Sequence, residues 1–216
     1  MAKDMQYDVA KLMLEQIERY GFALSGGRAL TELGLSSRPT KDLDVFMAKF
    51  DSAVFEQAVN TILAVLPTEG YSVSLDKMTD TFAKIAVSKD GQTVTVDLGY
   101  DYREYDPVRL EIGIVLNEKD AILNKMSALY SRSLPRDFID MYSIRKAKTV
   151  SDSDLLALSQ ERDEGFILGF FVEALQKIRQ LAYSDFVEYE ITRQDYENIV
   201  QSTLDWANEI ERMTTT

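Results

Sequence analysis

The 216-residue sequence contains no cysteine and no histidine. These two absences exclude a Ser-His-Asp triad, a thiolate nucleophile, a disulfide framework and a zinc site built from His or Cys. Any bound metal must then be held by oxygen ligands, and carboxylate and carbonyl oxygens suit Mg²⁺, Mn²⁺ or Ca²⁺. An enzyme of this composition is therefore expected to depend on a hard divalent cation.

Long apolar runs are also missing. Charged residues at positions 3, 4, 8 and 11 interrupt the amino-terminal stretch, which therefore lacks the apolar core of a signal peptide. The uncharged stretch from Gly165 to Val172 is far shorter than the roughly 20 residues that span a bilayer. A cytoplasmic protein without a membrane partner is expected, and the absence of cysteine is compatible with that compartment.

Basic residues are the minority, because 24 Lys and Arg stand against 36 Asp and Glu, a formal net charge of −12. The excess is uneven: residues 151–216 carry 14 acidic and five basic residues, a net charge of −9. A sustained basic stretch occurs at 119–148, which holds seven basic and three acidic residues. Scattered charges of this kind usually form a solvated helix face. A phosphate-facing surface is the alternative interpretation.

The hydrophobic pattern changes once along the chain. Up to residue 117, helical periodicity at 4–20 and 50–66 alternates with strand-like segments at 22–24, 43–46, 71–75, 82–88, 93–98 and 111–115. Further helices are predicted at 118–131, 135–146, 153–161, 164–182 and 193–213. The predicted fold class is α+β, with a mixed-sheet domain at 1–117 followed by a helical domain at 118–216.

A glycine turn follows the first predicted strand. Ser25, Gly26 and Gly27 stand between the strand at 22–24 and a helix predicted at 28–33. Backbone N–H groups in such a turn can approach a phosphate, and the helix N-terminus adds partial positive charge. Adjacent glycines more often serve the turn alone, so the sequence leaves both uses open.

Three aspartates form a candidate metal site. Asp42 and Asp44 are two residues apart in the strand DLDVF, so both carboxylates project from one face. Their like charges repel unless a cation neutralises them. Asp97 in VTVDL adds a third carboxylate from a neighbouring strand, with Asp101 as its alternative, and three oxygen ligands suit Mg²⁺. The competing interpretation is an exposed strand edge that carries acidic residues.

The basic stretch contains candidates for holding a triphosphate. Lys125 and Arg132 lie about two helical turns apart and hence on roughly one face. Arg136, Asp137 and Asp140 follow within one turn of the next helix, where Arg136 and Asp140 have the spacing of an exposed ion pair of small value. Lys and Arg side chains can instead hold the charge that builds up during phosphoryl transfer.

Two segments carry a family resemblance. FALSGGRALTELGLSSRPTKDLDVF resembles the glycine-turn and paired-aspartate segment of the nucleotidyltransferase superfamily. LNKMSALYSRSLPRDFIDMYSI resembles the second signature of its AbiEii/AbiGii toxin family, the MenA-like nucleotidyltransferase toxins. The resemblance covers residues 22–144, and the two signatures in this order are far more specific than either alone.

The resemblance implies a polymerase-β-like nucleotidyltransferase domain with a helical carboxyl domain. Its implied activity is Mg²⁺- or Mn²⁺-dependent transfer of a nucleotide from an NTP by the toxin of a toxin–antitoxin or phage-defence pair. Under this resemblance the catalytic carboxylates are Asp42, Asp44, Asp97 and Asp137, of which the first three hold the metal. The nucleotide-binding residues are Ser25, Gly26, Gly27, Lys125, Arg132, Arg136 and Asp140.

One position departs from the family pattern. A small hydroxyl residue commonly follows the paired glycines, whereas here Arg28 follows them and Ser25 precedes them. Arg28 is expected either to bind phosphate or to block the nucleotide pocket. Blocking would remove the activity.

Three functions remain open at this point. The leading prediction is a nucleotidyltransferase that modifies RNA, with tRNA as the acceptor expected from the family and a cognate antitoxin as partner. The alternative acceptor is a cationic hydroxyl compound of the aminoglycoside type, which the acidic carboxyl region would attract. The third interpretation is a non-catalytic relative that binds a nucleotide or a protein partner, favoured by Arg28 and opposed by the intact DLD motif.

Overall fold

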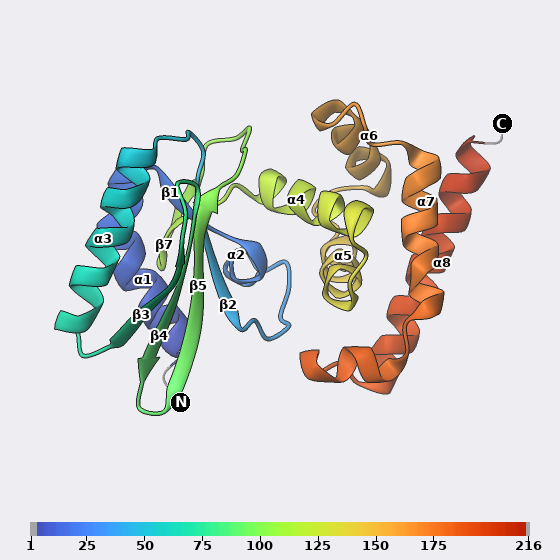
Figure 1. Ribbon diagram of the computed structural model, residues 1–216. Coiled ribbons are helices and arrows are strands. Elements are labelled where there is room, and N and C mark those ends of the chain that lie inside the picture. Colours follow the sequence, from blue (N-terminus) through green and yellow to red (C-terminus); the bar gives the residue numbers. More distant parts are fainter. Residues whose placement is uncertain (1–3, 215–216) are drawn as a thin grey trace. The chain divides into compact units, whose positions relative to one another are not determined.

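The computed structural model describes residues 4–214, which form two compact units. The first unit contains residues 4–33 and 40–121, and the second contains 34–39 and 122–214. A seven-stranded mixed sheet and a set of helices make up these units (Figure 1), which confirms the α+β class. The domain boundary after residue 117 stays a prediction, and the loop at 34–39 groups with the helical unit.

The first unit is built on a sheet with the strand order β3-β4-β5-β2-β1-β7-β6. Its strands are β1 (Phe22–Ser25), β2 (Asp42–Met47), β3 (Ser72–Met78), β4 (Phe82–Lys89), β5 (Gln92–Tyr100), β6 (Val108–Leu110) and β7 (Gly113–Val115). Strand β2 is central, because it runs antiparallel to β1 on one side and parallel to β5 on the other. The strand predicted at 111–115 is confirmed as β7, in a shorter form, whereas its hairpin partner β6 was not predicted.

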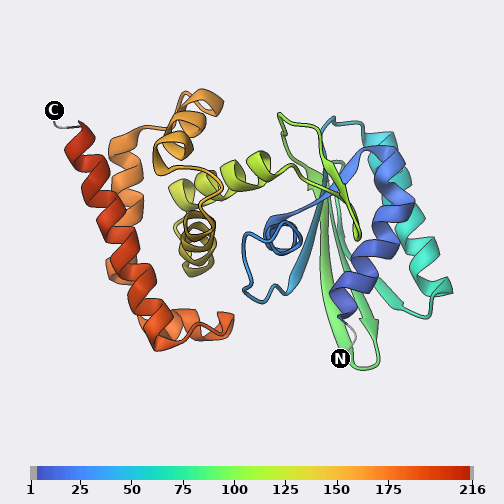
Figure 2. The same cartoon turned by 180° about the vertical axis from the view of Figure 1, so that it is seen from behind.

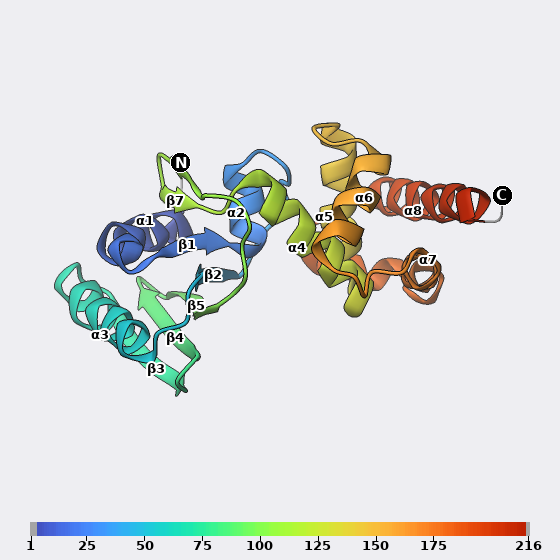
Figure 3. The same cartoon turned by 90° about the horizontal axis from the view of Figure 1, so that it is seen from above.

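Helices cover the two faces of this sheet unequally. Helices α1 (Met5–Ile17) and α3 (Ser52–Thr68) lie on one face, and the short α2 (Gly26–Glu32) lies on the other (Figures 1 and 3). Leu43 and Val45 on β2 are fully buried in the core together with residues of α1 and α3. Because successive side chains of a strand point to opposite faces, the polar residues of β2 and β5 share the face that α1 and α3 leave open.

Helices form the second unit. They are α4 (Glu118–Ser131), which begins in the last residues of the first unit, α5 (Pro135–Ala147), α6 (Asp152–Arg162), α7 (Leu168–Gln176) and α8 (Arg193–Thr214), with 3-10 helices at Lys177–Gln180 and Tyr183–Tyr189. Helices α7 and α8 lie side by side (Figure 2), and the ring of Phe171 meets that of Trp206 edge-on, with centroids 5.2 Å apart. No helix between residues 4 and 214 is long and apolar enough to cross a membrane.

The helix predicted at 164–182 is wrong at both ends. Helix α7 begins only at Leu168, because Asp163 first forms a tight turn in which its Oδ1 accepts the Gly165 N–H at 2.8 Å. The end of the predicted helix is a 3-10 segment that stops at Gln180. Hydrophobic periodicity continues through both segments, so it does not mark these breaks.

Candidate functional site

The predicted glycine turn lies where β1 ends and α2 begins. Ser25, the last residue of β1, is buried and pairs with Asp44 across the β1–β2 ladder. Gly26 has φ +63°, a left-handed conformation that favours glycine. A Cβ atom on Gly26 would lie 1.8 Å from Oδ2 of Asp44. The second aspartate of the DLD motif is therefore packed directly against the backbone of the turn.

This close approach makes Gly26→Ala a test of the turn. We expect the left-handed backbone to cost about 1–2 kcal/mol of unfolding free energy. The added Cβ must also displace the Asp44 carboxylate, which we expect to lower nucleotide transfer about a hundredfold. Urea unfolding and a transfer assay measure the two effects.

The matched control is Gly21→Ala. Gly21 also has a left-handed backbone, with φ +83°, but a Cβ there would meet nothing within 4 Å. This variant should lose similar stability and keep its transfer activity. Equal activity of the two variants would show that the contact between Gly26 and Asp44 is irrelevant to the chemistry.

Asp42, Asp44 and Asp97 share one face of the central sheet. Asp42 and Asp44 alternate with buried residues of β2, and Asp44 is the register partner of Asp97 on the parallel strand β5. All three aspartates are half-buried. The alternative third carboxylate, Asp101, lies beyond the end of β5. The structure thus brings together the three strand positions that the sequence selected, while their roles stay predictions.

These carboxylates fit a hard divalent cation in their chemistry. Oδ1 of Asp97 is buried and accepts no hydrogen bond, although Lys84 Nζ lies within ion-pair distance at 3.4 Å. Oxygen donors on one face and an unsatisfied carboxylate oxygen suit Mg²⁺ or Mn²⁺. Within residues 4–214, however, no three acidic side chains form a ready-made metal cage. The fit rests on the shared face and not on a completed coordination sphere.

Arg28 is held within the first unit. Its guanidinium lies 2.6 Å from Asp4 and 2.8 Å from Glu32, and it stands over the ring of Tyr7. Burial alone lowers the pKa of Arg28, but hydrogen bonds and attraction from Asp4 and Glu32 outweigh burial and raise the pKa above its ordinary value. These contacts join α2 to the start of α1. They explain Arg28 without either predicted role, phosphate binding or blocking of the pocket.

Asp137 of the second signature is an anchor for helix α5. It is fully buried, and Arg132 donates to both of its oxygens, at 2.8 and 2.9 Å. It also accepts the backbone N–H of Leu134 at 3.1 Å, which satisfies a donor at the helix N-terminus. The Arg132 side chain is 43% exposed, so one partner of this pair still reaches water.

Asp140 is fully buried between two cations. Arg38 donates Nε and Nη2 to its oxygens at 2.7 and 3.0 Å, and Lys125 Nζ lies 3.1 Å from Oδ2. Both cationic side chains are less than 10% exposed. Burial lowers the pKa of Arg38, but the hydrogen bonds and charge of Asp140 outweigh it and raise the pKa. The exposed pair predicted between Arg136 and Asp140 is wrong, because Asp140 is buried and is held by Arg38 and Lys125.

The role of Arg38 was not predictable from local sequence patterns. This residue stands in the polar loop at 34–39, where its guanidinium also lies 5.6 Å from the ring centre of Tyr189. Its partner Asp140 is 102 residues away, and no periodicity reports a contact at that separation. The available signal was its position inside the first segment that carries the family resemblance.

Comparison with known proteins decides the family. A family model described as nucleotidyl transferase AbiEii toxin, of a type IV toxin–antitoxin system, matches residues 11–212. The chain belongs to the AbiEii family. This result confirms the resemblance drawn from the two sequence signatures. No curated protein matches the sequence significantly.

Solved structures support the fold of this AbiEii member. A candidate nucleotidyltransferase from Helicobacter pylori is 17% identical, with a TM-score of 0.61 over 99% of this chain and 96% of that one. JHP933 from H. pylori is 19% identical, with a TM-score of 0.59 over 97% and 94%. MenT4, the nucleotidyltransferase toxin Rv2826c from Mycobacterium tuberculosis H37Rv, is 15% identical, with a TM-score of 0.56 over 96% and 86%. At these identities the likeness shows the nucleotidyltransferase fold alone.

Proposed function

We propose that this AbiEii-family chain is a Mg²⁺-dependent nucleotidyltransferase that transfers a nucleotide from an NTP to a hydroxyl of RNA, with tRNA as the expected acceptor. The observation that carries the proposal is the packing of Asp44 against the Gly26 backbone, beside Asp97 on the adjacent strand. A phosphate-binding turn and paired carboxylates at one place suit phosphoryl transfer without histidine.

The aspartates and glycines of the candidate site in the first unit have defined roles in this proposal. Asp42, Asp44 and Asp97 would hold the divalent cation, which when bound neutralises triphosphate charge and favours in-line displacement. The backbone at Gly26 and Gly27 contacts the triphosphate. The Asp97 carboxylate accepts a hydrogen bond from the acceptor hydroxyl and takes its proton, as the new O–P bond forms, the bond to pyrophosphate breaks and pyrophosphate leaves.

The basic residues of the second signature are not equally available to bind the phosphates of an NTP. Lys125 and Arg132 are already paired with Asp140 and Asp137, so each would have to exchange a partner to hold an NTP. Arg136 has a buried Nε without a hydrogen-bond partner, so its guanidinium retains unused donor capacity. We therefore place Arg136 first among the candidate phosphate ligands of this signature.

Two alternatives from the sequence fare differently. A small cationic acceptor is still favoured by one observation, the net charge of −9 over residues 151–216, which attracts cations. The non-catalytic interpretation relied on Arg28, and the pairing of Arg28 with Asp4 and Glu32 removes that support. Family membership also implies an antitoxin partner, while the cytoplasmic location and a role in phage defence remain proposals.

The experiment is a labelling assay with the full chain. The protein is incubated with each α-labelled NTP, MgCl₂ and total cellular RNA, and a parallel reaction contains a small-molecule extract in place of RNA. Label in RNA, lost on addition of EDTA and restored by excess MnCl₂, is the expected result. Label confined to small molecules would support the alternative acceptor. No label in either fraction would contradict both enzymatic functions.

A further inference from the structure

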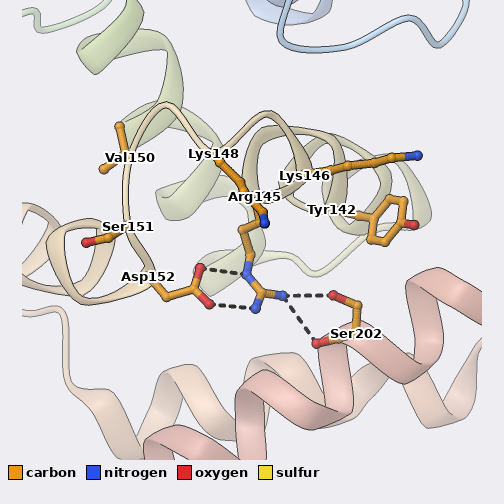
Figure 4. Close-up of a pocket in the computed structure, with 8 residues that line it drawn as sticks. All are labelled: Tyr142, Arg145, Lys146, Lys148, Val150, Ser151, Asp152 and Ser202. Carbon is orange, nitrogen blue, oxygen red and sulfur yellow. Dashed lines mark hydrogen bonds and ion pairs between the residues drawn. The ribbon is translucent and has the colours of Figure 1, made fainter.

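The second unit contains a basic pocket that the proposed chemistry does not use. It has a volume of about 550 Å³ and lies where α5 ends, the chain turns into α6, and α8 passes by (Figure 4). Three basic residues, Arg145, Lys146 and Lys148, line it together with Tyr142, Asp152 and Ser202. All of these residues belong to the one unit.

Helix geometry explains why part of this lining comes from one side of α5. Tyr142, Arg145 and Lys146 stand at positions i, i+3 and i+4 of α5 and therefore share one face. Lys148 ends the helix with φ 55°. Cations in the last turn also offset the negative end of the helix dipole. This interaction with the helix dipole explains why basic residues stand at the end of α5, but it does not explain why they line a pocket.

Arg145 is the fixed wall of this pocket. It donates to both oxygens of Asp152, at 2.8 and 2.6 Å, and Nη1 donates to the carbonyl and hydroxyl oxygens of Ser202 at 3.2 and 3.0 Å (Figure 4). Its guanidinium also stacks 4.3 Å from the ring centre of Trp206. Asp152 thus neutralises Arg145 and locks its geometry.

The two lysines remain unneutralised. Lys146 and Lys148 are exposed, and no carboxylate of the described residues lies within ion-pair distance of either one. Lys146 Nζ stands 5.8 Å from the ring centre of Tyr142, so an aromatic surface adjoins the positive charge. The pocket therefore offers two available ammonium groups and a ring.

We propose that this pocket docks one nucleotide of the acceptor RNA, its phosphate held by Lys146 and Lys148 and its base or ribose against Tyr142. This inference rests on the proposed function, because it concerns the RNA acceptor. A chain with a net charge of −12 must bind nucleic acid through a local basic site. The volume accommodates a whole nucleotide, and base stacking on an aromatic ring favours RNA over a carboxylate side chain.

Removal of both free charges tests the proposal. We compare Lys146→Gln/Lys148→Gln with a matched control, Lys177→Gln/Arg179→Gln, which removes two exposed charges from the same unit. The probe is an unmodified tRNA transcript. Loss of the contact to that one phosphate should weaken binding about 5-fold at about 0.1 M salt and reduce the slope of log K against log salt by about 0.7. The control should match the wild type.

Binding needs no turnover, which separates this inference from the proposed function. If the RNA acquires no label in the transfer assay but the transcript still binds less tightly to Lys146→Gln/Lys148→Gln, the proposed function is contradicted and the docking pocket is not. Equal binding losses in the two double variants would overturn the pocket, because net charge would then explain both.

Two further probes identify the occupant. Displacement of the bound transcript by AMP supports a nucleotide site if this displacement is lost in Lys146→Gln/Lys148→Gln. Pocket-dependent binding of AMP with unchanged RNA binding would overturn RNA docking in favour of a free nucleotide. Pocket-dependent binding of polyglutamate alone would overturn it in favour of an acidic protein partner.

Discussion

Asp44→Asn is expected to lower the rate of nucleotide transfer about a thousandfold, equivalent to about 4 kcal/mol of transition-state stabilisation. The substitution keeps the volume of the side chain that lies against Gly26 and removes the negative charge proposed to hold the cation. The proposed mechanism also needs a charged Asp44 beside Asp97, its register partner. Initial rates of label transfer at saturating NTP measure the effect, and thermal unfolding checks the fold.

The control for this variant is Asp80→Asn. Asp80 is exposed in the turn between β3 and β4 of the same unit, so it loses the same charge at a distance from the aspartate face of the sheet. We expect full activity from it. If Asp44→Asn retained more than about a tenth of the wild-type rate, a loss of less than about 1.4 kcal/mol, the metal role of Asp44 would be rejected.

Asp140→Asn is expected to lower the free energy of unfolding by about 3–5 kcal/mol, because it leaves buried cations without their counter-charge. Arg38 and Lys125 are both buried against Asp140, so neither charge can move into water without opening the unit. An ordinary domain has a total unfolding free energy of about 5–15 kcal/mol, so the expected loss is a large part of the stability of the unit. Urea denaturation followed by circular dichroism measures the loss.

Asp137→Asn serves as the comparison. Asp137 is equally buried, but its partner Arg132 is 43% exposed, so the released guanidinium can turn into solvent. We expect a smaller loss, about 1–2 kcal/mol, for the weakened cap and hydrogen bonds. Equal losses at the two positions would show that the burial of the partner cations does not set the cost.

Local signals predicted most of the first unit. The pair Asp90-Gly91 is typical of a two-residue hairpin turn, and both residues have positive φ in the turn between β4 and β5. Alternation in β2 and β5 identified the open face correctly. The short strand β6 escaped prediction because three residues carry too little alternation to be distinguished from a loop.

In the candidate site, too, local patterns were predictable and long-range contacts were not. Gly26, Asp44 and Asp97 were selected because local patterns place them at strand ends and on strand faces, and the ladder then makes them neighbours. The partners of Asp140 were not predictable in this way. Helix spacing offered Arg136, one turn away, as one possible partner, whereas tertiary packing brings Arg38 from a loop 102 residues earlier. Helix spacing governs exposed pairs, but a buried carboxylate takes whichever cations the core brings to it.

The loop at 34–39 changes how the protein can be divided experimentally. A cut at residue 117, natural on the sequence pattern, would produce an amino-terminal fragment that keeps Arg38 and a carboxyl-terminal fragment that keeps Asp140. In the carboxyl-terminal fragment, Lys125 would then remain an ion-pair partner of the buried Asp140. In the amino-terminal fragment, Arg38 would lack Asp140, its ion-pair partner in the intact chain. Fragment complementation should therefore depend on Arg38, and a carboxyl-terminal fragment should be soluble only when the amino-terminal one is co-expressed with it.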